Sequence, residues 1–146
     1  MSDKFVYVTY IKTTPEKLWD ALTKPEFTKQ YWFGVTLECD WKAGSPWKMM
    51  YDDGRVTDSG EIIEAEKPKR IAIKWRNEFM PELKEEGWSR CVMELEPVND
   101  TVKLTITHMI DKIGSKFIQA VSGGWPRILS SLKTMLETGH ALPPTK

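Results

Sequence analysis

The sequence predicts an α+β fold in which a curved antiparallel sheet of six or seven strands wraps around a long C-terminal helix. Three observations lead to this prediction. A strand-like segment is followed by two short helix signals, the middle of the chain alternates β-branched and aromatic segments with turns, and a long amphipathic stripe ends the chain. At 146 residues we expect one domain, residues 1–146, with an ordered core over about 4–139.

The N-terminal part combines one strand with a repeated helix signal. Residues 4–12, KFVYVTYIK, are β-branched and aromatic, which favours a strand. The pattern Thr-x-Pro-Glu follows at residues 13–16 and recurs at 23–26. Pro25 has no N–H and disfavours a helical Lys24, so the first helix must end before it. We therefore expect two short helices at an angle rather than one long helix.

The first of these helices has two possible N-terminal caps. Thr13 can cap it with Glu16 returning the hydrogen bond, as in a capping box. Alternatively, Thr14 can cap it with Pro15 at the first helical position, where the missing N–H costs nothing. A helix begins here in either case.

The middle of the chain is a meander of strands separated by turn residues. Polar turn segments interrupt it at residues 42–45, 52–54, 67–69 and 99–100, and Asp52-Asp53-Gly54 is typical of a hairpin. A longer loop, about Asn77 to Gly87, mixes Phe79, Met80 and Leu83 with acidic residues. The predicted strands are residues 35–41, 47–51, 55–66, 70–75, 88–96 and 101–109.

The C-terminal segment, residues 116–138, has helical periodicity. Its apolar residues form one stripe that spans the whole segment: Phe117, Val121, Trp125, Ile128, Leu129, Leu132 and Leu136. Gly139 is placed to cap its C-terminus. Gly123, Gly124 and Pro126 weaken the middle, so we expect a kink or a fresh start near Trp125. This helix alone is long enough to cover the inner face of the sheet, and the two short helices are expected to close one end.

Composition excludes several classes of protein. Lys plus Arg and Asp plus Glu both number 21, so the chain lacks the net positive charge of a nucleic-acid binder. Neither a signal peptide nor a run of about 20 apolar residues is present, which predicts a cytoplasmic protein without a membrane span. Cys39 and Cys91 are expected to be reduced thiols, and with two histidines a zinc site is not predicted.

Several motifs resemble those of a known family. Residues 14–26, TPEKLWDALTKPE, and the following Tyr31-Trp32-Phe33 are similar to the opening motif of bacterial relatives of the activator of heat-shock-protein-90 ATPase. Gly60-Glu61-Ile62, Trp75 and the spacing of residues 124–132 match later parts of the same family. The resemblance covers about residues 4–139. It implies the helix-grip fold of the START and birch-pollen-allergen superfamily, whose members commonly keep a cavity for an apolar ligand between sheet and helix.

The inward faces of the predicted elements are rich in Trp and Met, which suit either such a cavity or a filled core. His108 lies on the inward face by strand parity, where it could donate to a ligand or simply be a capped core histidine. The loop 77–87 could gate the cavity or be an acidic surface loop. The predicted ligand-binding residues are Trp32, Phe33, Trp47, Met49, Trp75, Met93, Ile106, His108, Phe117, Val121 and Trp125.

The leading functional hypothesis is a non-enzymatic, monomeric binding protein for a small hydrophobic or aromatic molecule, such as a lipid, polyketide or flavonoid. The sequence contains no Gly-rich phosphate loop, nucleophile elbow, metal cluster or acid–base pair, so no catalytic residue and no cofactor is predicted. Two alternatives follow from the resemblance. One is a chaperone-partner domain similar to the heat-shock-protein-90 activator, and the other is an enzyme similar to aromatases and cyclases of this fold, which would use His108.

Overall fold

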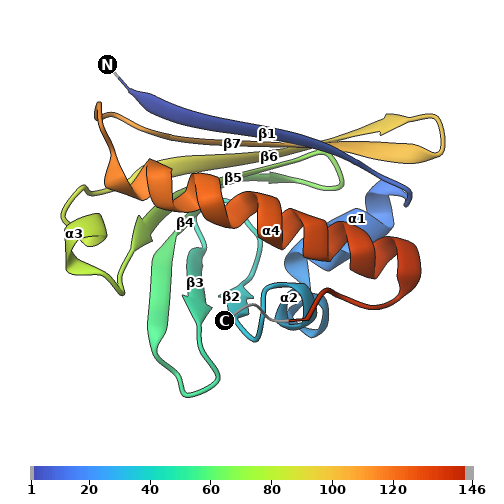
Figure 1. Ribbon diagram of the computed structural model, residues 1–146, viewed down its shortest axis with the longest axis horizontal. Coiled ribbons are helices and arrows are strands. Elements are labelled where there is room, and N and C mark those ends of the chain that lie inside the picture. The colour runs from blue at the N-terminus through green and yellow to red at the C-terminus, as the bar shows by residue number, and fades with distance from the viewer. Residues whose placement is uncertain (1, 144–146) are drawn as a thin grey trace.

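The computed structural model describes residues 2–143. Seven strands form one antiparallel sheet in the order β1-β7-β6-β5-β4-β3-β2, and the helix α4 lies lengthwise across one face of it (Figure 1). The short helices α1 and α2 lie together at one end of α4. The strands are β1 Asp3–Ile11, β2 Thr36–Cys39, β3 Pro46–Met50, β4 Val56–Glu66, β5 Arg70–Asn77, β6 Ser89–Val98 and β7 Thr101–Ile110, and the helices are α1 Pro15–Thr23, α2 Pro25–Tyr31, α3 Pro81–Lys84 and α4 Lys116–Thr138.

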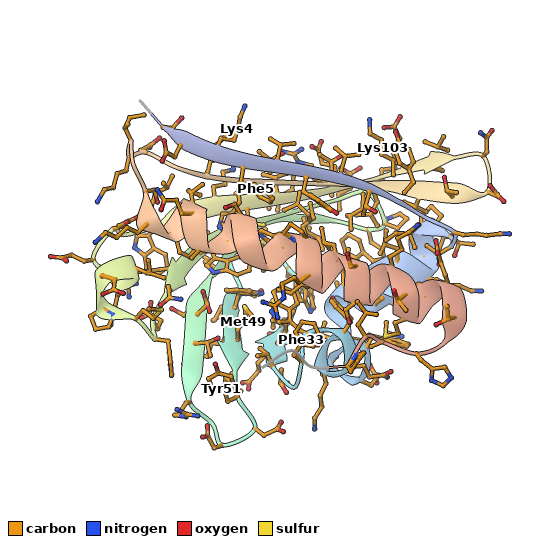
Figure 2. The ribbon with its side chains drawn as sticks, viewed as in Figure 1. Lys4, Phe5, Phe33, Met49, Tyr51 and Lys103 are labelled. Atoms are coloured by element: carbon orange, nitrogen blue, oxygen red, sulfur yellow. The ribbon has the colours of Figure 1, made fainter. Side chains whose placement is uncertain are left out.

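The predicted α+β fold and the order of its elements are confirmed. Side chains alternate along the strands between the face that α4 covers and the opposite, outer face. In Figure 2, Phe5 of β1 points toward α4 and Lys4 points away from it. On β5, Ile71, Ile73 and Trp75 are all buried, as their alternation predicts. These inward side chains form one core with the apolar stripe of α4.

The two short helices arise as the repeated proline signal predicts. The hydroxyl of Thr14 accepts a hydrogen bond of 3.2 Å from Lys17 N, and Pro15 occupies the first helical turn. Thr14 is therefore the cap, and the alternative that placed Thr13 there is wrong. Lys24, extended at φ −91° and ψ 129°, separates α1 from α2. The proline that follows it forces this conformation.

Helix α4 has the predicted bounds, but the fresh start expected near Trp125 is wrong. The helix continues through Pro126 as one element. Trp125 and Leu129, on either side of the proline, are both buried against the sheet, and this packing outweighs the local cost of the proline. Gly139 closes the helix at φ 90°. None of the helices in the described part of the chain is long and apolar enough to cross a membrane.

The loop after β5 differs from the prediction because it contains the helix α3. The side chain of Glu86 binds this loop to the N-terminus of α4. Its carboxylate accepts hydrogen bonds from Ser115 Oγ at 2.5 Å, Lys116 N at 2.8 Å and Phe117 N at 3.3 Å. The loop is therefore attached to the helix that covers the sheet, which fixes one wall of the site described next.

Candidate functional site

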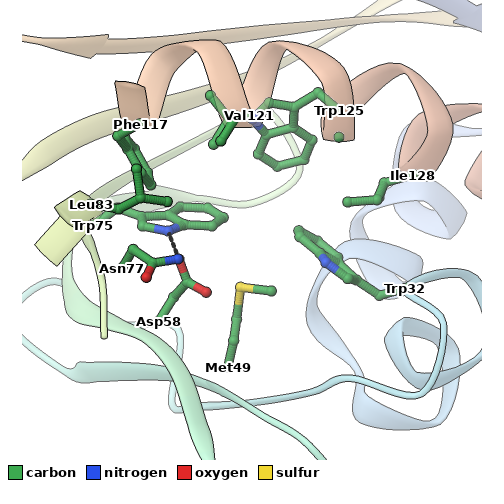
Figure 3. Close-up of a pocket in the computed structure, with 12 residues that line it drawn as sticks. Trp32, Met49, Asp58, Trp75, Asn77, Leu83, Phe117, Val121, Trp125 and Ile128 are labelled. Atoms are coloured by element: carbon green, nitrogen blue, oxygen red, sulfur yellow. Dashed lines mark hydrogen bonds between the residues drawn. The ribbon is translucent and has the colours of Figure 1, made fainter. Parts of the chain in front are cut away.

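A cavity of about 190 Å³ lies between α4 and the inner face of the sheet. Figure 3 shows its walls, which come from the end of α2, from β3, β4 and β5, from α3 and from α4. Most of the lining is apolar, and Asp58 and Asn77 are the polar side chains. The lining residues are Trp32, Met49, Asp58, Trp75, Asn77, Leu83, Phe117, Ala120, Val121, Gly124, Trp125 and Ile128.

Three tryptophan rings dominate the cavity. The ring centroids of Trp32 and Trp125 are 5.4 Å apart, those of Trp75 and Trp125 are 5.8 Å apart, and those of Trp32 and Trp75 are 6.5 Å apart. Trp125 meets both of the other rings edge to face. These distances fall within the range of favourable aromatic pairs, so each ring holds the others in place.

Asp58 places a carboxyl group inside this apolar wall. The residue is 8% exposed, and its Oδ2 accepts a hydrogen bond of 2.7 Å from Trp75 Nε1 (Figure 3). Burial raises the pKa of this carboxyl, although the bond from Trp75 and the nearby Thr57 and Asn77 side chains favour its ionised form. Asp58 is thus a largely buried carboxyl group in a wall that is otherwise mostly apolar.

Asn77 has a fixed orientation beside Asp58. Its Oδ1 accepts hydrogen bonds from Phe79 N at 3.0 Å and Met80 N at 2.8 Å, which turn the loop toward α3. Because Oδ1 accepts these two bonds, the Asn77 group that faces the cavity is the amide nitrogen, which is a hydrogen-bond donor.

His108 lies in the core and outside the cavity wall. Trp125 Nε1 donates to its Nδ1 at 3.2 Å, and its Nε2 is 2.9 Å from Ser89 Oγ. Ser89 Oγ in turn donates to the Trp75 carbonyl at 2.8 Å. Both ring nitrogens are therefore occupied, and burial lowers the pKa of His108 to about 3. The capped core histidine is the alternative that this geometry favours.

The structure brings together six of the eleven residues predicted to bind a ligand. These six line the cavity: Trp32, Met49, Trp75, Phe117, Val121 and Trp125. Four others are buried but are not part of its lining: Trp47, Met93, Ile106 and His108. Phe33 borders two other depressions, next to Arg127, and is not part of the cavity lining.

Sequence reasoning missed the polar side of the cavity. Asp58 pairs directly with Met49 across β3 and β4, and with Asn77 across β4 and β5. Since directly paired residues share a face of the sheet, Asp58 points inward together with Met49. The hairpin at residues 52–54 does not supply this register, because the pairing of β3 and β4 shifts between Met49 and Met50. Leu83 was missed because α3 was not predicted.

Charged residues outside the cavity lining pair with one another. Arg76 Nε lies 2.6 Å from Glu78 Oε2, and the guanidinium carbon of Arg76 lies 4.3 Å from the centroid of the Trp88 ring. Arg90 is exposed on the neighbouring strand β6. Within residues 2–143, no group of three His, Cys, Asp or Glu side chains is placed to hold a metal ion.

Comparison with known proteins identifies the family. The family model described as Activator of Hsp90 ATPase homolog 1-like protein matches residues 12–137. No curated protein matches the chain.

Solved structures support the same fold at low sequence identity. Protein MLL2253 from Mesorhizobium loti superimposes with a TM-score of 0.79 at 21% identity, covering 92% of this chain and 97% of that one. The Aha1 dimer from Colwellia psychrerythraea gives 0.74 at 22%, covering 94% and 98%. DynU16, from the dynemicin biosynthetic locus, gives 0.76 at 19%, covering 95% of this chain and 49% of DynU16.

Proposed function

Since the chain belongs to the family of Activator of Hsp90 ATPase homolog 1-like proteins, we propose that it uses the family's helix-grip scaffold to bind a small apolar or aromatic molecule. The observation that carries this proposal is the cavity of about 190 Å³ between α4 and the sheet. A core that served only stability would be packed to nearly uniform density. Here Trp32, Trp75 and Trp125 line a pocket that is partly open to solvent.

The size of the cavity limits the ligand. An engineered protein cavity of about 150 Å³ holds one benzene molecule, whereas drug-sized ligands occupy pockets of about 300–1,000 Å³. At about 190 Å³ the space suits one ring with a short substituent. A long lipid chain or a flavonoid would require Val121 or Met49 to move.

Binding without catalysis is the simplest use of this geometry. His108, the residue that an aromatase-like or cyclase-like reaction would need, already has both ring nitrogens hydrogen-bonded. Asp58 is the remaining acid of the cavity, and a single carboxyl without a second titrating group defines no proton-transfer pair.

The indole N–H signals of the seven tryptophans provide the test. Indole, benzyl alcohol and a fatty acid are titrated into the labelled protein, and the shifts are followed by heteronuclear NMR. We expect the single-ring compounds to shift Trp32, Trp75 and Trp125 together. Trp41 and Trp88 lie outside the cavity lining and serve as internal controls. Equal or scattered shifts across all of the indoles would contradict the proposal.

A chaperone-partner function is the second candidate, because β1 carries apolar side chains on its outer face. Val6, Val8 and Tyr10 are 49%, 43% and 48% exposed, and they alternate along an edge strand of the sheet. Such a row suits a protein partner. The candidate is tested by adding the protein to an Hsp90 chaperone and measuring its ATPase rate. Stimulation that is lost in Val8→Lys and kept in Val121→Phe would favour it.

We further propose a monomer located in the cytoplasm. The free Cys39 and Cys91 thiols suit a reducing compartment. Sedimentation at several concentrations tests the monomer, since the Colwellia psychrerythraea relative is a dimer.

A further inference from the structure

The carboxyl of Asp58 has no cationic partner among residues 2–143. It forms no salt bridge with any lysine or arginine within residues 2–143. The charged neighbour that influences it is Glu78, whose negative charge further raises the pKa of Asp58. Buried carboxylates in folded proteins are normally paired with a cation or neutralised. The ionised form of Asp58 therefore needs a positive charge next to it in the cavity.

The groups that face Asp58 do not supply that charge. Trp75 Nε1 donates one neutral hydrogen bond from β5, and Thr57 and Asn77 are neutral as well. Glu78 is itself paired with Arg76 at 2.6 Å and with Lys84 at 3.1 Å. These two cations are therefore already engaged with another carboxylate.

The aromatic wall also favours a cation. A positive charge is attracted to an aromatic ring when it lies within about 6 Å of the ring centroid, and tryptophan is the strongest partner. The three tryptophan centroids are separated by 5.4–6.5 Å, so the rings are in contact with one another, and a cation in the cavity that they line is close to more than one ring. Figure 3 shows these rings around the space next to Asp58.

We propose that the ligand of this cavity is a small organic ammonium ion that carries one ring or a compact apolar group. The ammonium donates to the Asp58 carboxylate, and the apolar body packs among the tryptophans and against Val121 and Ile128. This inference rests on the proposed binding function and names its ligand class. The ammonium ion is a different ligand class from the lipid or polyketide expected from the sequence.

The test compares three probes of nearly equal size and different charge. Benzylammonium, benzyl alcohol and benzoate are titrated against the wild-type protein at neutral pH, with tryptophan fluorescence and the indole N–H signals as readouts. We expect benzylammonium to bind at least about tenfold more tightly than benzyl alcohol, a difference of about 1.4 kcal/mol. Benzoate should bind most weakly, because Asp58 and Glu78 repel it.

Asp58→Asn isolates the role of the charge. The side chain keeps its size and an oxygen that can accept from Trp75 Nε1, so the shape of the cavity is kept, and benzyl alcohol is the reference ligand for the variant. The preference for benzylammonium should disappear. Asp52→Asn, which removes an exposed carboxylate at the tip of the β3–β4 hairpin, is the matched control and should keep the preference.

The outcomes separate the two proposals. If benzyl alcohol binds in the cavity as well as benzylammonium does, or if the preference persists in Asp58→Asn, the ammonium inference is wrong and the binding function stands. If neither compound shifts the cavity tryptophans, the binding function itself fails. Should Asp58→Asn not fold, the wild-type comparison of benzylammonium with benzyl alcohol still decides the inference.

Discussion

Trp125 Nε1 donates a hydrogen bond of 3.2 Å to His108 Nδ1. Because Nδ1 accepts, the neutral ring carries its proton on Nε2, which then donates to Ser89 Oγ at 2.9 Å. The chain of donors ends at the Trp75 carbonyl, which accepts from Ser89. Two of the cavity tryptophans are thus connected through a histidine that must stay neutral.

This connection predicts an acid-sensitive fold. Burial lowers the pKa of His108 from 6.5 to about 3, so between these values the unfolded chain binds one more proton than the folded chain. The stabilising effect of the neutral ring is complete above about pH 6.5 and is lost as the pH falls. We expect this group to reduce the free energy of unfolding by about 1.4 kcal/mol per pH unit. Urea unfolding between about pH 4 and pH 7 measures the slope.

The matching variants assign the slope to one histidine. His108→Gln should lower the free energy of unfolding at neutral pH, because the hydrogen-bond network is disturbed. It should also reduce the slope of the free energy of unfolding against pH by about 1.4 kcal/mol per pH unit, which corresponds to one proton. His140→Gln, which changes the exposed histidine, should leave the slope as in wild type. Equal slopes in wild type and His108→Gln would show that His108 is not the titrating group.

Gly60 lies where β4 and β5 come unusually close. A Cβ atom built on it would be 1.6 Å from the carbonyl oxygen of Lys74 and 2.7 Å from the carbonyl carbon. Both are backbone atoms, so the strands themselves would have to separate. We expect Gly60→Ala to destabilise the protein by at least about 3 kcal/mol, as measured by urea unfolding.

Gly123 offers the opposite case in the same chain. It is helical, and a Cβ there would meet no atom within 4 Å. Gly123→Ala should therefore stabilise the protein by about 0.5–1 kcal/mol through the higher helix propensity of alanine. A Gly60→Ala protein as stable as Gly123→Ala would contradict the close approach of the strands.

The fold was predictable because its signals are local and periodic. The proline at residue 25 divides the two short helices, and the apolar stripe from Phe117 to Leu136 defines α4 to the residue. Continuity at Pro126 was not predictable, because it depends on how Trp125 and Leu129 pack against a sheet made from distant residues. Local propensity carries no information on that packing.

The site was predictable only on its apolar side. Alternation places Trp75 inward, and the same reasoning places His108 inward. It does not show that His108 lies in the core while Trp75 reaches the cavity. Asp58 was missed because the register of β3 and β4 shifts between Met49 and Met50, so the hairpin at residues 52–54 does not by itself pair Asp58 with Met49. Only the cross-strand register to Met49 reveals its direction.

Glu86 holds the loop of α3 against α4 through three hydrogen bonds. Although burial opposes ionisation, the bonds from Ser115, Lys116 and Phe117 lower the pKa of this carboxyl. Its stabilising effect is therefore present above the pKa of the unfolded chain and is lost as the pH falls below it. We expect Glu86→Ala to cost about 2–3 kcal/mol and to increase hydrogen exchange in residues 79–87.

Glu85→Ala is the control for this prediction. Glu85 is exposed and lies next to Glu86 in sequence, so the variant removes the same charge without losing the bonds to α4. Its stability should stay within about 0.5 kcal/mol of wild type. If Glu85→Ala and Glu86→Ala are equally stable, the carboxylate at the start of α4 is not what holds the loop.

Val121 projects from α4 into the cavity and is the residue best placed to fill it. Val121→Phe adds a ring to a space of about 190 Å³, so it should compete directly with a single-ring ligand. We expect the affinity for benzylammonium to fall at least about tenfold. The free energy of unfolding should change by less than about 1.5 kcal/mol, because the new ring enters space that is empty in the wild-type protein.

A phenylalanine at an exposed position of the same helix is the control. It adds the same apolar surface without filling the cavity. Gln119 is exposed, so Gln119→Phe should leave the affinity unchanged. Titration calorimetry on the two variants and the wild type gives the comparison directly. If Val121→Phe binds as the wild type does, the ligand does not occupy the space beside Val121. If Val121→Phe unfolds, the space is not available to a ring. Either result would favour the chaperone-partner function over ligand binding in the cavity, because Val6, Val8 and Tyr10 are exposed on the outer face of β1.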